Sequence, residues 1–248
     1  MPRRSNLCKV TKKREKEKTV YLFLQSGNNK SLLLGNNKKM VVKMMKIIIK
    51  LGKMSNFVEN SNQMKTMIYI ESKRKSMEKL REKYPDAMII DVTSHAEDEF
   101  VKLSPFYPVG GIPVPFTDTF GLSVEGIWQG LKVFETAGVD KQLFWKKDMK
   151  NMKRTTRRFG RCLGHSKGLS GTELLEYIEA RKKIYLPCYK WVLENKVQKL
   201  VTAIRVISKT KPVVLLDYNT NGDVEDWHRP LSHASLIKAY IEGNYPEC

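Results

Sequence analysis

Cysteine is scarce in this chain. The sequence of 248 residues holds four cysteines, at positions 8, 162, 188 and 248, and no two of them form a Cys-x-x-Cys pair. A structural zinc site needs clustered thiols, and a small disulfide scaffold needs a much higher cysteine density. We therefore expect a reduced compartment, with no metal site and no disulfide framework.

Long apolar runs are also absent. No stretch approaches the roughly 20 apolar residues that a membrane-spanning helix needs. The N-terminus does not resemble a secretory signal, because its first apolar cluster is short and follows a long charged stretch. These absences predict a chain without a membrane span and a cytoplasmic location.

Acidic residues are scarce in the N-terminal quarter of the chain. The whole sequence has 45 Lys and Arg residues against 26 Asp and Glu residues, a net charge of +19. Residues 1–66, here called the basic head, hold 16 basic and three acidic residues, so the other 182 residues carry only +6. A strongly basic region attracts nucleic acid or anionic membranes. The head is therefore the candidate contact for nucleic acid.

The basic head allows two interpretations. Lysines recur at three- and four-residue steps from Lys39 to Lys53 with apolar residues between them, which is typical of a basic amphipathic helix. Alternatively, the head is a disordered segment or an upstream extension, with Met54, Met64 or Met67 as a later start. Its richness in Lys, Asn and Ser and its few core-forming residues favour the second interpretation.

Residues 67–248 are expected to form one α+β domain, mostly helical with a small sheet. Apolar runs predict strands at 67–70, 87–92 and 213–216. A proline-rich loop is expected at 103–121, where four prolines oppose regular structure. Periodicity and terminal signals predict helices at 71–83, 123–137, 171–183, 187–209 and 232–242.

The expected helix at 123–137 has two contrasting faces. One face carries apolar residues at helical spacing, namely Val124, Ile127, Leu131 and Phe134. The opposite face carries Glu125, Trp128, Gln129 and Lys132. This second face is either solvated, with Glu125 favoured by the helix dipole, or a functional face covered by the proline-rich loop. A tryptophan is unusual on a solvated face, which keeps the functional alternative open.

Several of these residues resemble a known family. Ser104-Pro-Phe106, the proline-rich loop, and Ser123-x-Glu125-x-x-x-Gln129-x-x-Lys132 are similar to the central signature of the NADAR superfamily. Gly160-Arg161 resembles the family's Gly-Arg step, and the acidic loop Asp223-Val-Glu-Asp-Trp227 resembles part of its C-terminal half. The resemblance covers about residues 103–241. It departs from the family at Gly126, where a larger residue is usual, and at His228, where glycine is usual.

The resemblance implies an N-glycosidase that hydrolyses a ribosyl or ADP-ribosyl N-glycosidic bond without a metal or other cofactor. Its substrate would be a small molecule or an ADP-ribosylated partner. Breaking such a bond develops an oxocarbenium-like cation, which a carboxylate can stabilise. Glu125 is the first catalytic candidate and is expected to stay ionised, and Asp223 and Asp226 are candidates for a second carboxylate. The substrate-binding candidates are Lys132, Gln129, Trp128, Trp227, Arg161 and Phe106.

Other interpretations of the same residues remain open. The fold could carry a non-catalytic module that binds a nucleotide or an ADP-ribosylated partner, or the chain could bind nucleic acid through its basic head. The acidic loop could be a simple turn, and His233 could be a neighbour of a helix cap. The basic, glycine-punctuated segment 154–167 could hold phosphates or be solvated, but its spacing does not match a Walker A loop.

If the basic head is dispensable for folding, a chain that begins at Met67 should unfold cooperatively. The physical reason is that the head supplies charge and few core-forming residues. A thermal melt followed by circular dichroism measures this. A non-cooperative melt, or a midpoint far below that of the full chain, would show that the head packs on the domain.

Overall fold

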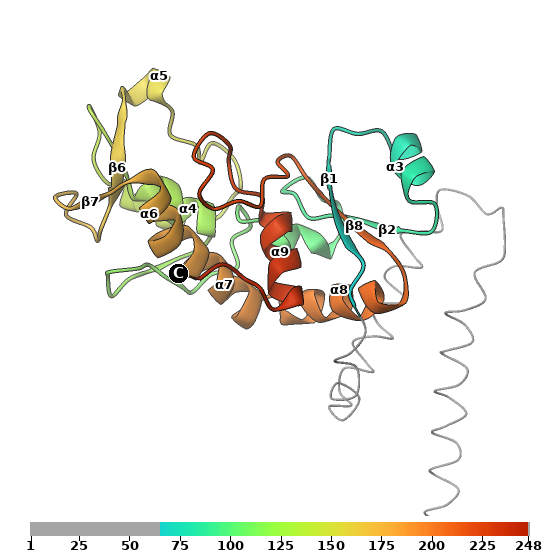
Figure 1. Ribbon diagram of the computed structural model, residues 1–248. Coiled ribbons are helices and arrows are strands. Elements are labelled where there is room, and N and C mark those ends of the chain that lie inside the picture. Colours follow the sequence, from blue (N-terminus) through green and yellow to red (C-terminus); the bar gives the residue numbers. More distant parts are fainter. Residues whose placement is uncertain (1–64, 248) are drawn as a thin grey trace, which may run out of the picture. The chain divides into compact units, whose positions relative to one another are not determined.

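The computed structural model describes residues 65–247 (Figure 1). The basic head therefore lies outside the described residues, apart from Lys65 and Thr66, and both its amphipathic helix and its boundary with the domain stay predictions. The described residues form an α+β fold, with more residues in helices than in three small sheets. This fold class confirms the prediction. Among the described residues, no helix is both long and apolar enough to cross a membrane.

The largest apolar strand lies at the centre of a parallel sheet. Its strand order is β1 (Ile68–Ser72), β8 (Val213–Asp217) and β2 (Met88–Asp91). Ile68 of β1 and Met88 of β2 both pair with Val213, so β8 separates the two strands of the expected β-α-β opening. Every residue of β8 is buried, which explains its continuous apolar sequence, because helices and loops cover both faces of a parallel sheet.

Helices cover the two faces of this sheet. Leu80 of α3 (Met77–Lys83) packs with Val214 and Leu216, which share one face of β8. Helices α8 (Gln198–Thr210) and α9 (His233–Glu242) also contact β8 (Figure 1). Helix α3 begins six residues later than predicted because β1 continues through Ser72, and Met77 is exposed rather than directed inward.

A proline inside a helix changes its hydrogen bonding without ending it. Helix α6 (Tyr177–Ala180), the π-helix η5 (Arg181–Tyr185) and α7 (Leu186–Asn195) follow one another directly. The N–H of Leu186 donates to Arg181 O, five residues back. Pro187 has no N–H and its ring would meet the carbonyl of the residue four positions earlier, which a wider turn relieves. The predicted helix break before Pro187 is therefore wrong, and the break falls at residues 196–197.

Two smaller sheets are antiparallel. Strands β3 (Ile112–Pro113) and β4 (Phe120–Gly121) form a short pair inside the proline-rich loop. Strands β5 (Lys132–Phe134), β6 (Cys162–Ser166) and β7 (Leu174–Leu175) form the third sheet. The predicted helix at 171–183 is therefore wrong in its first half. The remaining elements are η3 (Glu99–Leu103), α4 (Val124–Gly130), η4 (Lys141–Trp145) and α5 (Thr156–Phe159).

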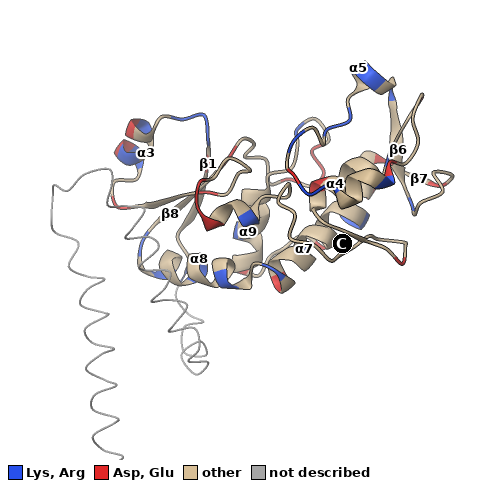
Figure 2. Cartoon of the chain, turned by 180° about the vertical axis from the view of Figure 1, so that it is seen from behind, with Lys and Arg blue, Asp and Glu red and all other residues tan. Residues whose placement is uncertain are grey.

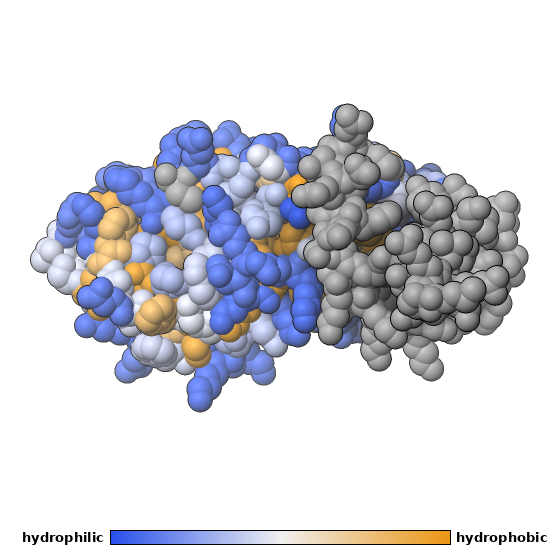
Figure 3. All heavy atoms as spheres, turned by 90° about the horizontal axis from the view of Figure 1, so that it is seen from below, coloured by the Kyte–Doolittle hydropathy of each residue, from blue (hydrophilic) through white to orange (hydrophobic). Residues whose placement is uncertain are grey.

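Apolar residues on the surface are dispersed. On the face shown in Figure 3, apolar residues lie in small groups among hydrophilic ones. The exposed large apolar side chains come from many different elements, from Tyr69 in β1 to Trp227 after β8. Single exposed apolar residues are normal on protein surfaces.

A buried ion pair joins the end of β8 to α9. His233 Nδ1 lies 2.9 Å from Asp217 Oδ2, and His233 Nε2 lies 2.8 Å from Val92 O. The Ser232 hydroxyl donates to the same carboxylate oxygen and accepts from Ser235 N, so it also caps α9. Burial alone would lower the pKa of His233, but the Asp217 carboxylate outweighs it and the pKa is raised. Burial would raise the pKa of Asp217, but His233 and Ser232 hold it lowered.

Replacing His233 with Gln should destabilise the fold by roughly 3–5 kcal/mol, because Asp217 would remain buried without its cation. Since the folded pKa of His233 is raised, its contribution is full below the unfolded pKa, about 6.5, and is lost as pH rises through the folded value. Urea unfolding of both proteins across pH should therefore show a difference that narrows at alkaline pH.

His95→Gln is the matched control, because His95 is exposed. A pH-independent difference between the native chain and His233→Gln would contradict the ion-pair assignment.

Candidate functional site

Helix α4 is buried on all sides. Ser123 caps it, with its Oγ accepting from Gly126 N at 3.0 Å, and all residues from Val124 to Gly130 are buried. Gly126 and Gly130 let η4 approach closely: a Cβ at Gly126 would lie 2.5 Å from Leu143 O, and one at Gly130 would lie 2.4 Å from the Phe144 ring. The solvated-face alternative is therefore wrong. The close approach of Leu143 O gives a steric reason for glycine at position 126.

The α4 helix is shorter than the sequence predicts. The predicted helix at 123–137 ends at Gly130, and Lys132 begins β5. Strand pairing takes over at this point, because Ser166 N donates to Leu131 O and Lys132 pairs with His165 of β6. Lys132 is therefore near α4 through a strand and not through an i+7 helical position.

Glu125 is a buried carboxylate held by a neutral amide. It is 7% exposed, and Gln129 Nε2 donates to its Oε1 at 2.8 Å. Gln129 Oε1 accepts from Arg154 N at 3.1 Å, which fixes the orientation of the amide. The backbone N–H of Glu125 donates to Pro105 O in the proline-rich loop. The proline-rich loop is thus bonded to the backbone of the residue that carries the carboxylate.

The environment of Glu125 raises its pKa. Burial is the main cause, opposed in part by the Gln129 hydrogen bond and by the positive charges of Lys132, Lys153 and His233. Loss of hydration therefore has a larger effect on the pKa of Glu125 than its place in the first turn of a seven-residue helix, and its ionised state stays a prediction. A carboxyl group with a raised pKa can exchange a proton closer to neutral pH.

Lys132 shares this environment. Burial lowers its pKa, and the Glu125 carboxylate opposes that change. Its Nζ lies 6.0 Å from the centroid of the Trp128 ring. The structure therefore brings together four predicted site residues from α4 and β5: Glu125, Trp128, Gln129 and Lys132.

Trp128 is enclosed by other rings. Its ring lies 3.7 Å from that of His165, tilted by 33°, and meets Tyr177 and Tyr185 edge-on at 5.9 and 5.7 Å. His165 is 1% exposed, and neither ring nitrogen has a hydrogen-bond partner within the described residues. Burial, followed by the charge of Lys132, lowers the pKa of His165 to about 3, so the ring is neutral. Buried nitrogens without a hydrogen-bond partner are rare in proteins.

Arg154 is a buried residue that contacts the backbone next to these site residues. Its guanidinium donates to Lys132 O at 2.6 Å and to Gly138 O at 2.8 Å. It also lies 4.9 Å from the Phe134 ring centroid and 5.0 Å from that of Phe159. Sequence reasoning placed Arg154 and His165 in a basic loop and missed their burial. The short β6 strand could have revealed His165, but the glycines around it obscured the alternation of its residues.

The remaining basic and aromatic candidates lie at different places. Arg161 is exposed, and its Nε lies 3.4 Å from Glu135 Oε1, so its carboxylate partner is outside the buried group. Phe106 is half-buried, and Lys153 Nζ lies 5.9 Å from its ring centroid. Because Lys153 also influences the pKa of Glu125, Phe106 belongs to the surroundings of the site.

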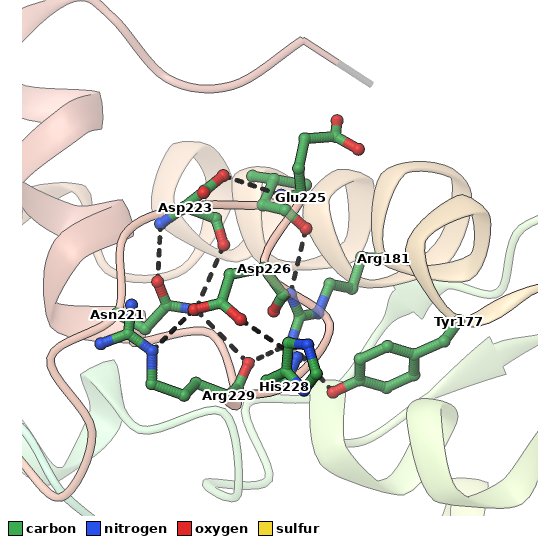
Figure 4. A network of polar contacts seen from close by, with 9 residues as sticks. Tyr177, Arg181, Asn221, Asp223, Glu225, Asp226, His228 and Arg229 are labelled. Carbon is green, nitrogen blue, oxygen red and sulfur yellow. Dashed lines mark hydrogen bonds and ion pairs between the residues drawn. The ribbon is translucent and has the colours of Figure 1, made fainter.

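The acidic loop uses its carboxylates to hold its own shape (Figure 4). Asp223 Oδ1 accepts from Glu225 N at 2.9 Å, and Asp226 Oδ1 accepts from His228 N at 3.0 Å. Asp226 Oδ2 pairs with Arg229 Nε at 2.6 Å, which lowers the pKa of Asp226. Trp227 is 64% exposed, and its ring lies 3.7 Å from that of His228. These contacts favour the turn interpretation for Asp223 and Asp226.

Arg181 anchors this loop to the helix beside Trp128 (Figure 4). Its side chain is buried in η5 and donates to the carbonyls of Val224, Asp226 and Arg229 at 3.0, 2.8 and 2.5 Å. It also donates to the Tyr177 hydroxyl at 3.0 Å. Since the Tyr177 ring meets Trp128, the acidic loop is held next to the aromatic side of the site. Sequence reasoning missed Arg181, which stands in an ordinary-looking Arg-Lys-Lys run.

No cluster of three or more His, Cys, Asp or Glu side chains suited to a metal ion occurs within residues 65–247. Comparison with curated proteins gave no match, and comparison with solved structures gave none either. A family model matches residues 72–237, more than half of the chain. The chain therefore belongs to that family, which is described as a family of unknown function (DUF6939).

Proposed function

We propose that this protein is an N-glycosidase that hydrolyses a ribosyl or ADP-ribosyl N-glycosidic bond, with Glu125 as its catalytic carboxylate. The observation that supports the proposal is the buried Glu125 carboxylate, which is bound by Gln129 and interacts electrostatically with Lys132. The resemblance of Glu125, Gln129 and Lys132 to the NADAR signature supports the same assignment. A buried carboxylate without a strong cationic partner is costly for folding, so its presence favours a chemical role.

The environment of Glu125 suits this chemistry. Cleavage of the C–N bond leaves positive charge on the sugar. The hydroxyl of a water molecule adds to the sugar carbon, and the nucleobase or amine leaves with a proton that comes from the water. In a poorly hydrated site, an ionised carboxylate stabilises that charge strongly. A raised pKa also suits Glu125 as the base that accepts a proton from the attacking water.

The neighbouring side chains have binding roles in this proposal. Lys132 binds a phosphate or a sugar hydroxyl of the substrate. Each tryptophan ring has a histidine ring 3.7 Å away, His228 for Trp227 and His165 for Trp128. Trp227 is 64% exposed and can stack on a nucleobase, whereas Trp128 is buried. Gln129 keeps the carboxylate in place through its bonds to Glu125 and to Arg154 N.

A second function has one observation in its favour. Asp223 and Asp226 are both engaged in hydrogen bonds of their own loop. They therefore do not serve Glu125 as a second carboxylate in this arrangement. A site with one carboxylate is compatible with a module that binds a nucleotide or an ADP-ribosyl group without cleaving it. Turnover by the native chain separates the two functions.

Glu125→Gln should lower turnover about 100- to 1,000-fold, because it removes one preorganised electrostatic group and keeps its size. The measurement is release of base or sugar from ADP-ribosylated nucleic acid and from phosphoribosylamine compounds. Glu82→Gln, an exposed change on α3, is the control and should keep full activity. Turnover by Glu125→Gln equal to that of the control would refute the catalytic assignment.

The pH dependence of kcat/KM should follow the two shifted groups. If ionised Glu125 is required, activity falls as pH drops through its raised pKa, at a higher pH than for an ordinary glutamate. If protonated Lys132 is required, activity falls as pH rises through its lowered pKa. In Glu125→Gln, the residual activity should lose the acidic limb and keep the alkaline one.

Lys132→Ala should raise KM more than it lowers kcat, because a phosphate or hydroxyl contact is made in both the bound and the transition state. Lys79→Ala on α3 removes the same charge from an exposed position and serves as the control. A fall in kcat with unchanged KM would instead place Lys132 in the bond-breaking step.

A further inference from the structure

The described domain has one strongly basic segment of its own. Residues 141–167 contain ten Lys and Arg residues and a single acidic residue, Asp148. Seven of these basic side chains are exposed, and one of the seven, Arg161, pairs with Glu135. The other six are here called the basic surface: Lys141, Lys147, Lys150, Lys153, Arg157 and Arg158. Figure 2 shows the basic residues of α5 and of the nearby loop on the α4 side of the domain. These residues belong to the described domain and not to residues 1–66.

The cations of the basic surface lack ion-pair partners. Within residues 65–247, none of the six side chains forms an ion pair with a carboxylate, whereas Lys146, Arg161 and Lys167 in the same segment do. Several lysines elsewhere in the described domain are paired: Glu71 binds Lys75 and Lys83, and Glu179 binds Lys183. Like charges without ion-pair partners repel one another, which disfavours the folded state. Their concentration points to an external anion.

Aromatic and guanidinium groups indicate which anion fits. Trp145, at the end of η4, is 54% exposed within the basic segment. Arg158 lies 5.1 Å from the centroid of the Phe159 ring. An exposed ring stacks on an unpaired base, and arginine binds phosphate through two parallel hydrogen bonds. An acidic protein would use the charges but would not need the exposed tryptophan.

The basic surface reaches the candidate site through two consecutive residues. Lys153 is close enough to affect the pKa of Glu125 and of Lys132, and its Nζ lies near the Phe106 ring. The next residue, Arg154, is buried and contacts the backbone of Gln129 and Lys132. A strand bound at Lys153 would therefore lie next to Arg154, which contacts Gln129 and Lys132.

We propose that the basic surface binds single-stranded nucleic acid, with Arg157, Arg158 and Lys153 on its phosphates and Trp145 stacked on a base. This binding is a property of the domain, independent of the basic head and of catalysis by Glu125. Its salt dependence comes from the phosphates that the surface neutralises.

The test measures binding of the full chain to a fluorescent oligothymidine of about 20 nucleotides by anisotropy across a salt series. Arg157→Gln/Arg158→Gln should weaken binding and lower the slope of log K against log salt by about 1.4, at about 0.7 per lost phosphate contact. Lys79→Gln/Arg81→Gln on α3 removes the same charge from exposed positions and should leave the slope unchanged. Trp145→Ala should weaken binding about tenfold with no change in slope.

Three outcomes would overturn the proposal. Unchanged binding by Arg157→Gln/Arg158→Gln would assign the affinity to the head, and equal losses in the α3 control would reduce it to net charge. Displacement of the oligonucleotide by poly-glutamate as readily as by unlabelled oligonucleotide would identify an acidic protein as the partner. Because the assay needs no turnover, an inactive enzyme with intact binding would refute only the proposed function.

Discussion

The arrangement of the described domain depends on the buried pair of Asp217 and His233. Asp217 ends the central strand β8, while His233 begins α9 and also bonds Val92 O beyond β2, so one imidazole joins two strands to a helix. Its ring meets Tyr189 of α7, which stacks on Tyr185 of the π-helix, and Tyr185 meets Trp128. The parallel sheet and the candidate site are therefore connected through packed rings, and a loss of this pair would reach both.

Two buried carboxylates of this domain are compensated in opposite ways. Asp217 has an imidazole, a hydroxyl and a backbone N–H as partners, which together outweigh burial and lower its pKa. Glu125 has a neutral amide as its hydrogen-bond partner, and burial raises its pKa. A carboxylate that is fully compensated serves the fold, whereas one that keeps the cost of burial is available for chemistry. This contrast separates the structural site at the sheet edge from the candidate active site, although both lie in the same interior.

The sequence pattern predicted those elements that depend on neighbouring residues. It failed for elements whose ends or burial depend on contacts with segments distant in the sequence. The apolar run of β8 and the cap at Ser232 are readable from sequence. The end of α4 is not, because it depends on β6 pairing beyond Leu131 and on Phe144 packing against Gly130. Glu125, Trp128 and Gln129 were identified from helical spacing. Lys132 was identified by the same spacing, yet it reaches the site from a strand. His165 and Arg181 were missed because only tertiary contacts bury them.

The net charge of the domain and the local charge of its surface also differ. The 182 residues beyond the head carry a net charge of only +6, which argues against a nucleic-acid partner for the domain. That sum conceals how the acids are distributed, because several of them pair with nearby cations: Glu71 of β1 pairs with Lys75 and Lys83, Glu179 of α6 with Lys183, and Asp226 of the acidic loop with Arg229. Few acids are left for residues 141–167, where cations accumulate next to a buried carboxylate and an exposed ring. Anion binding depends on local potential, so the modest total is compatible with a strongly basic face beside the candidate site.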